Sequence, residues 1–350
     1  MNIPELDDNK YKVNVKLDFS ETLNPLGIPG TIKKAVSLRE KMWQSYPDPN
    51  YRSLRRKLAV YENIPIDNIV CGNGGDDMIF RVIAAIRPKN ALVFSPCSGE
   101  YGRALIQMGC NVTDIQISPK NNFTVTSEIT EYIRNDTDMI FLCSPNDPTG
   151  DVITPYTLKT VAERCIKTDT FIVCDERFME FVYQHEKYSM KQYLSEKVIV
   201  IKSFTEIFAM AGLPVGYALC GDKETAEKIR NAGQLYSISG AALAAAEASF
   251  ELKKFLPWTR KYTSVMRDYL SSELTRLGIP VLPSKADFLL FRSELQIDKL
   301  LLRRGILIKN CSEGFGLGSG YYRIGIRSRE ENEILISEIE RIMRTYNVSL

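Results

Sequence analysis

The residues best placed to do chemistry follow three strand-like runs that lie roughly 30 residues apart. They are found in LCSPNDPTG (142–150), VCDERFMEF (173–181) and KSFTEIFAMAGLPVGY (202–217). Each segment carries a carboxylate after its strand: Asp147, Asp175 and Glu206. Because parallel strands end at one edge of a sheet, the three segments are expected to meet there. A carboxylate at such an edge acts as a general base when burial raises its pKa.

A fourth segment, CGNGGDDMIF (71–80), is a glycine-rich turn that follows a strand and opens a helix. Glycines such as Gly74 and Gly75 let backbone N–H groups approach an anion, and a helix N-terminus favours a phosphate. An ordinary strand-to-helix turn has the same pattern, so both interpretations stay open. Asp76 and Asp77 are expected to cap the helix in either case.

Histidine and cysteine usage excludes several kinds of site. The single histidine, His185, lies in the polar run YQHEKYS and is predicted to be a surface residue, which leaves no histidine-rich metal centre. The eight cysteines are scattered singly, several of them in apolar strand-like runs, where cysteine behaves as a small buried hydrophobe. A structural zinc site or a disulfide framework is therefore not expected. Any difficult chemistry would come from a cofactor.

Composition places the chain among cytosolic globular proteins. Of its 350 residues, 44% are hydrophobic and 25% charged, and the formal net charge is +2. A net charge this close to zero does not indicate a nucleic acid or an anionic membrane as a partner. The first ten residues are polar and acid-rich, unlike a signal peptide, and no apolar run is long enough to span a bilayer. We therefore expect a cytoplasmic protein.

The elements that position these residues follow an α/β pattern. Strand-like runs are expected at 68–72, 91–96, 111–117, 138–145, 170–176, 197–203 and 215–220. Helix-like segments lie between most of them, at Asp77–Ile86, Glu100–Met108, Tyr156–Ile166 and Glu224–Ala232. The alternation predicts a mostly parallel sheet that is covered on both faces.

After about residue 239 the alternation stops. Helices are expected at Gly240–Lys253, Tyr262–Leu277 and Glu330–Tyr346, with short strands at Phe288–Arg292, Ile306–Lys309 and Tyr321–Ile326. This order indicates a smaller α+β lobe. The predicted division is an N-terminal segment (1–45) that packs with the small domain, a large domain (46–250) and a small C-terminal domain (251–350).

Taken together, these segments resemble the fold-type I enzymes that depend on pyridoxal 5′-phosphate (PLP). The resemblance is strongest to the branch that holds histidinol-phosphate aminotransferases and threonine-phosphate decarboxylases. The decarboxylase side is favoured by DFSETLNPLG (18–27), YPDPNYRSLRRKLA (46–59) and IKNCSEGFGLGSGYYRIGIRSREEN (308–332). It implies a PLP-dependent transferase fold, an amino acid or amino acid phosphate as substrate, a role in cobalamin biosynthesis and a homodimer.

The resemblance also implies residue roles. Asp175 matches the carboxylate beneath the pyridine nitrogen, and Arg323 matches the arginine that grips the substrate carboxylate. A helix-capping Asp175 and a solvent-facing Arg323 are the structural alternatives. The implied cofactor-binding residues are Tyr46 (offered across the dimer), Gly74, Gly75, Asp76, Ser98, Asp147, Asp175 and Ser203. The implied substrate-binding residues are Asn24, Tyr101, Arg323 and Arg327.

Four positions depart from the family pattern inside this pocket. Glu206 stands where the family carries the Schiff-base lysine, and Pro214 stands where an arginine clamps the cofactor phosphate. Asp147 replaces an asparagine that bonds the ring hydroxyl, and Ser98 replaces the aromatic that stacks on the ring. These changes shift the formal charge of the pocket by −4, which should weaken binding of an anionic cofactor by several kcal/mol, at roughly 4 kcal/mol per close pair.

Three functions are compatible with this sequence. The first is a PLP-dependent decarboxylase or aminotransferase, as the family resemblance implies. The second is a degenerate paralogue that kept the scaffold and serves as a binding or partner subunit. The third is a lysine-independent enzyme that holds pyridoxamine phosphate without a covalent bond and uses Glu206 as its base. Lys202 is the nearest substitute amine, but its backbone position would present it from another direction.

Overall fold

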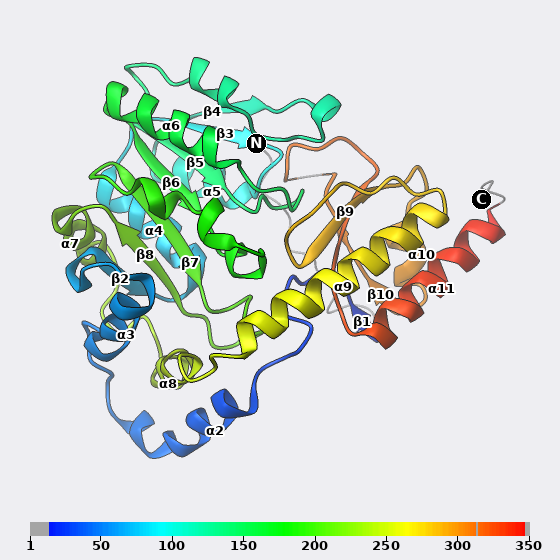
Figure 1. The fold of residues 1–350 in the computed structure, drawn as a ribbon, viewed down its shortest axis with the longest axis horizontal. Helices are drawn as coiled ribbons and strands as arrows, with labels where there is room; N and C mark the ends of the chain where they lie inside the picture. Colours follow the sequence, from blue (N-terminus) through cyan, green and yellow to red (C-terminus); the bar gives the residue numbers. More distant parts are fainter. Residues whose placement is uncertain (1–13, 313, 347–350) are drawn as a thin grey trace.

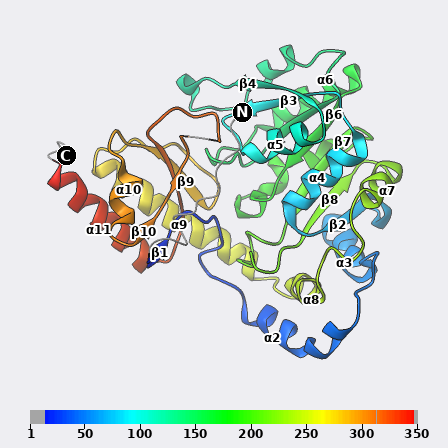
Figure 2. The same cartoon turned by 180° about the vertical axis from the view of Figure 1, so that it is seen from behind.

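The computed structural model describes residues 14–312 and 314–346. Figure 1 shows a large sheet with helices on both faces and, beside it, a smaller group of short strands and helices. The long helix α9 (Phe255–Arg276) runs from the first part into the second. Seen from behind, α2 (Gly30–Leu38) and α8 (Gly240–Ser249) lie side by side along the lower edge of the large part (Figure 2).

The large sheet has seven strands, and its register confirms the mostly parallel arrangement. The strand β8 is antiparallel to both of its neighbours, and the remaining pairs are parallel. In spatial order the strands are β2 (Ile69–Gly72), β8 (Gly216–Cys220), β7 (Val198–Ser203), β6 (Phe171–Asp175), β5 (Met139–Cys143), β3 (Asn90–Ser95) and β4 (Asn111–Gln116). The predicted strand positions are confirmed to within about two residues at each end.

Side chains alternate between two hydrophobic cores, one on each face of the sheet. In β5, Ile140 and Leu142 join one core, whereas Met139 and Phe141 join the other. The first core is covered by α3 (Arg52–Glu62), α6 (Pro155–Thr168) and α8. The second is covered by α4 (Gly74–Ile86), α5 (Gly99–Gln107) and α7 (Lys223–Asn231). The same alternation decides to which face each polar residue at a strand end belongs.

The smaller part is built on a three-stranded antiparallel sheet. Its order is β11 (Lys309–Asn310), β12 (Tyr321–Gly325), β9 (Phe288–Arg292). It packs with α9, α10 (Ile297–Leu302) and α11 (Arg329–Thr345) around a third core. The strand β1 (Leu17–Asp18) pairs with β10 (Ile306–Leu307), which brings the N-terminal segment beside this part. The division into domains at residues 46 and 251 stays a prediction.

Two predictions need correction. The predicted helix Gly240–Lys253 ends at Ser249, and the next helix begins at Phe255 rather than Tyr262. Phe255 stacks on Phe208, with ring centroids 5.7 Å apart, so the apolar contact extends the helix toward its N-terminus. His185, predicted to lie on the surface, has a side chain only 19% exposed because it packs beside Glu180.

The prediction for the cysteines is confirmed. All eight cysteines are buried and free, as their apolar surroundings suggested. Within the described residues, no group of three potential ligands is arranged to hold a metal ion. No helix of the described chain is long and apolar enough to cross a membrane.

Candidate functional site

Asp175 ends β6 on the face covered by α4 and α5, and only 1% of the residue is exposed. The hydroxyl of Tyr101, on α5, donates a hydrogen bond to Asp175 Oδ2 at 2.8 Å. Tyr101 is itself buried and stacks on Phe141, with ring centroids 5.1 Å apart. Two predicted site residues are therefore in direct contact, and Asp175 is a buried acceptor rather than a helix cap.

Arg177 supplies the cation that Asp175 requires. Its Nε and Nη2 lie 2.9 and 2.8 Å from Asp175 Oδ2, and its backbone N–H donates to Oδ1 at 3.1 Å. Its Nη1 lies 2.9 Å from Asp76, in the first turn of α4. Burial opposes the charge on Arg177, but Asp175 and Asp76 raise its pKa well above the usual value. The side chain is a permanent cation between two carboxylates.

The Arg177 side chain also fills space over the glycine-rich turn. A Cβ built on Gly75 would lie 3.1 Å from Arg177 Cζ, which leaves little room between the two. Gly74, at φ +89°, would bring a Cβ within 3.3 Å of Pro214. The turn to which the resemblance assigns the cofactor phosphate is therefore flanked by an arginine bonded to carboxylates and by a proline that offers no N–H donor.

Glu206 lies in the turn after β7 and is 9% exposed. Its Oε2 has no hydrogen-bond partner within the described chain. Burial raises the pKa of Glu206, and the nearby Arg177 partly opposes that rise. A carboxyl group of this kind can accept or hold a proton but cannot form an imine.

Arg323, on β12, is also paired within the protein. Its Nη1 bonds Asp147 Oδ1, and its Nη2 donates to the Ser20 carbonyl at 3.1 Å. It is 7% exposed, so it is not the solvent-facing arginine of the structural alternative. Asp287 lies close behind this pair, and both of its carboxyl oxygens lack a hydrogen-bond partner among the described residues.

The remaining predicted site residues do not converge on this pair of arginines. Asn24 uses its amide internally, donating to the Ile207 carbonyl at 2.7 Å and to Thr259 at 3.0 Å. Ser98 caps α5, and Ser203 accepts the N–H of Thr205 at 3.0 Å. Arg327 lies beside Glu331 at 3.8 Å, in the first turn of α11.

Tyr46 is 82% exposed in the single chain and lies against Tyr236, with ring centroids 4.5 Å apart. It makes no contact with Asp175 or Arg323 within this chain. A role across a dimer therefore stays a prediction.

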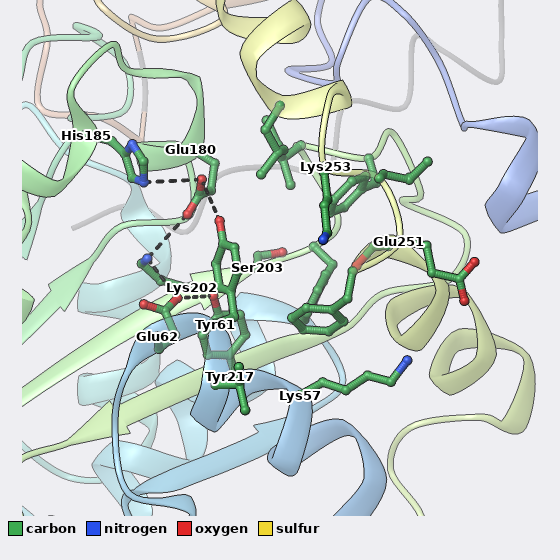
Figure 3. A pocket seen from close by; sticks show the side chains of 18 of the residues that line it. Lys57, Tyr61, Glu62, Glu180, His185, Lys202, Ser203, Tyr217, Glu251 and Lys253 are labelled. Carbon is green, nitrogen blue, oxygen red and sulfur yellow. Dashed lines mark hydrogen bonds and ion pairs between the residues drawn. The ribbon is translucent and has the colours of Figure 1, made fainter.

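Lys202, the nearest lysine in sequence to Glu206, does not reach the site around Asp175. It precedes Ser203 in β7, so it projects to the face opposite Asp175. Its Nζ lies 2.9 Å from Glu62 and 3.4 Å from Glu180 (Figure 3). Burial lowers the pKa of Lys202, but these two carboxylates outweigh that effect and raise it. The amine stays protonated and points away from the site.

Comparison with known proteins establishes the family. The model of aminotransferase class I and II matches residues 14–339. The chain belongs to the aminotransferase class I and II family. It is 30% identical to a threonine-phosphate decarboxylase of Salmonella typhimurium, over 93% of this chain and 91% of that protein. It is 29% identical to a histidinol-phosphate aminotransferase of Symbiobacterium thermophilum, over 93% and 90% of the two chains.

Solved structures agree with this assignment. The histidinol-phosphate aminotransferase of Clostridium acetobutylicum matches with a TM-score of 0.88 and 26% identity, covering 94% of this chain and 99% of that one. The L-threonine-O-3-phosphate decarboxylase of Porphyromonas gingivalis, at 22% identity and a TM-score of 0.84, covers the same shares and supports the fold alone.

Members of this aminotransferase family use PLP, but the residues present here do not fit that cofactor. The carboxylate that would face a pyridine nitrogen is bonded to Arg177. The arginine that would bind a substrate carboxylate is bonded to Asp147. Glu206, which the resemblance assigns to the position of the imine-forming amine, is a carboxylic acid. On the roles that the resemblance implies, each of these groups therefore has a protein partner or lacks the chemistry that the cofactor requires.

Sequence reasoning missed Arg177, although a signal was present. In VCDERFMEF, Arg177 directly follows the two carboxylates Asp175 and Glu176 at the end of an apolar strand. It also missed Asp287, which precedes β9 in an otherwise apolar ADFLLF run. A charged residue beside a buried strand end is a reason to look for a buried partner.

Proposed function

We propose that this chain is a cofactor-independent member of its family, a paralogue that has lost PLP catalysis and acts as a binding or partner subunit. The observation that carries the proposal is the bonding of Arg177 to Asp175. PLP could pair its ring nitrogen with Asp175 only by displacing a guanidinium whose Nε–H donates to both carboxylate oxygens and whose Nη2 lies 2.8 Å from Oδ2. A charge-assisted hydrogen bond of this kind is worth roughly 1.5–3 kcal/mol.

The other substitutions support the same conclusion. Glu206 adds a carboxyl group where a cationic amine would stand, and Pro214 removes a cation and a backbone donor from the phosphate end. Asp147 neutralises Arg323, which would otherwise attract a substrate carboxylate. The activities named for the relatives, decarboxylation of threonine phosphate and transamination of histidinol phosphate, require these groups to be free.

One observation favours a second function. The free Oε2 of Glu206 and the raised pKa of this group suit a general base in a lysine-independent enzyme. That function requires Arg177 to leave Asp175, or a substrate that needs neither residue. The Glu206→Gln variant tests it, because turnover of any amino acid by the wild type should then disappear.

The proposed function is tested by adding PLP to the purified protein. We expect no visible Schiff-base absorbance, no stoichiometric retention of PLP on dialysis and, after borohydride reduction, no pyridoxyl adduct on one defined residue by peptide mass mapping. A variant combining Glu206→Lys, Pro214→Arg, Asp147→Asn and Arg177→Ala serves as the positive control. Retention of one PLP per wild-type chain would overturn the proposal.

A further inference from the structure

A large cavity lies on the sheet face opposite Asp175. Its volume is about 880 Å³, at the upper end of the range for small-molecule sites. It lies between the C-terminal ends of α3 and α8, the strand end at Lys202 and the first turn of α9 (Figure 3). Among the predicted site residues only Ser203 also lines it. The cavity is therefore a separate place for a ligand.

The deep end of the cavity is polar, but its charges are already compensated. Glu62 binds Lys202 and Lys191 at 2.9 and 2.8 Å, and Glu180 binds Arg260 at 2.7 Å. Burial opposes ionisation of Glu62, yet the two lysines lower its pKa to about 2. His185 sits beside Glu180, and burial lowers its pKa, so it stays neutral. A ligand gains no unpaired charge at this end.

The middle of the cavity is apolar and aromatic. Phe204 and Phe250 pack edge to face, with ring centroids 5.8 Å apart, and Phe208 lies next to Phe204 at 6.1 Å. Leu256 and Pro257, from the first turn of α9, complete this wall. Such a surface takes the flat or aliphatic body of an organic molecule.

The rim carries two exposed cations, Arg56 and Lys253, that have no ion pair within the described part of the chain. Six cationic side chains and four carboxylates line the cavity, an excess of two positive charges when His185 is neutral. Lys253 has no ion pair or hydrogen bond within the described residues. In Figure 3 its amino group turns toward the centre of the cavity, whereas the Glu251 carboxylate turns outward.

The start of α9 adds to this positive potential. The helix has 22 residues, no side-chain cap and no acidic residue in its described first turn. Leu256 and Pro257 of that turn line the cavity, so the positive end of the helix dipole lies at the rim beside Lys253.

We propose that this cavity binds a small organic monocarboxylate, with its apolar body on Phe204, Phe250 and Leu256 and its carboxylate at Lys253 and the start of α9. A second negative charge deeper in the cavity would find no unpaired cation, because Lys191, Lys202 and Arg260 are already paired with Glu62 and Glu180. This cavity would then be the binding site of the proposed function. The proposal rests on that function, because it assumes that the chain acts by binding a ligand.

The test measures binding of two probes, 4-phenylbutyrate and its uncharged amide, to the full-length protein. Isothermal titration calorimetry gives the affinity and the number of sites for each probe. We expect one site per chain that prefers the acid. Lys253→Met should weaken binding of the acid about three- to fivefold and leave the amide unchanged, as expected for a partly exposed ion pair. Leu256→Trp should narrow the cavity at its apolar wall and weaken binding of both probes.

Lys228→Met is the matched control, because Lys228 is an exposed lysine of α7 that lies outside the cavity lining. It should change neither affinity. The inference is overturned by three outcomes: no saturable binding of the acid up to about 10 mM, equal affinity for acid and amide, or no effect of Leu256→Trp. None of these three outcomes bears on the PLP titration. Conversely, stoichiometric retention of PLP would refute the proposed function but would not show whether this cavity binds a carboxylate.

Discussion

Removing the guanidinium of Arg177 should destabilise the folded chain strongly. In Arg177→Met, Asp175 would keep the Tyr101 hydroxyl at 2.8 Å and the backbone N–H of residue 177 at 3.1 Å. It would lose the two side-chain contacts at 2.9 and 2.8 Å that neutralise it. Breaking a buried ion pair by removing one partner costs about 3–5 kcal/mol. We expect the lower part of that range, because two donors remain.

Urea unfolding followed by circular dichroism measures this loss as a lower transition midpoint. A double-mutant cycle with Asp175→Asn separates the pair from its surroundings. The double variant should be less destabilised than the sum of the two single variants, by about 2–3 kcal/mol, because it leaves no buried charge behind.

Arg304→Met is the matched control for Arg177→Met. Arg304 binds Glu338 at 2.6 Å, but its side chain is 36% exposed. Its removal should cost less than about 1 kcal/mol. If Arg177→Met were no more destabilising than this control, or if the cycle showed no coupling, the claim that Arg177 neutralises a buried carboxylate would be wrong.

Three further predictions concern pH, assembly and recovery of the cofactor site. Burial raises the pKa of Asp287 from its ordinary value of 3.8 to about 8. Its contribution to stability is therefore full below about pH 4 and is lost progressively as the pH rises from there to 8. The stability advantage of Asp287→Asn over wild type should accordingly grow by about 2–3 kcal/mol between pH 5 and 7 in urea unfolding, and a constant difference would contradict this. The chain should sediment as a dimer at micromolar concentration through exposed aromatic residues near Tyr46, and Tyr46→Glu should shift it toward monomer; a monomeric wild type would refute this. The triple variant Glu206→Lys, Pro214→Arg, Asp147→Asn should bind little PLP until Arg177→Ala is added, which absorbance titration of both variants will show; equal binding by both would mean that Arg177 is not the obstacle.

Most of the fold could be predicted because apolar periodicity encodes it locally. Runs such as TFIVCDE mark buried strands, and the parallel order of β6 and β7 brings Asp175 and the Glu206 turn to one edge. The pairing of Asp147 with Arg323 could not be predicted in this way, because 176 residues separate them. The sequence around each residue does not indicate which residue it contacts. The orientation of the Arg177 side chain depends on the room left beside Gly75, which has no Cβ. That room is defined only by tertiary packing.

The two buried ion pairs have a common physical origin. A carboxylate such as Asp175, 1% exposed, needs a cation whether or not a ligand supplies it, because an unpaired buried charge is severely destabilising. Arg323, 7% exposed, needs an anion for the same reason. In this chain Arg177 and Asp147 meet both needs from within the protein. The folded state is thus independent of any ligand at this site, so added PLP should leave its unfolding midpoint unchanged, whereas a ligand that binds only the native state would raise it.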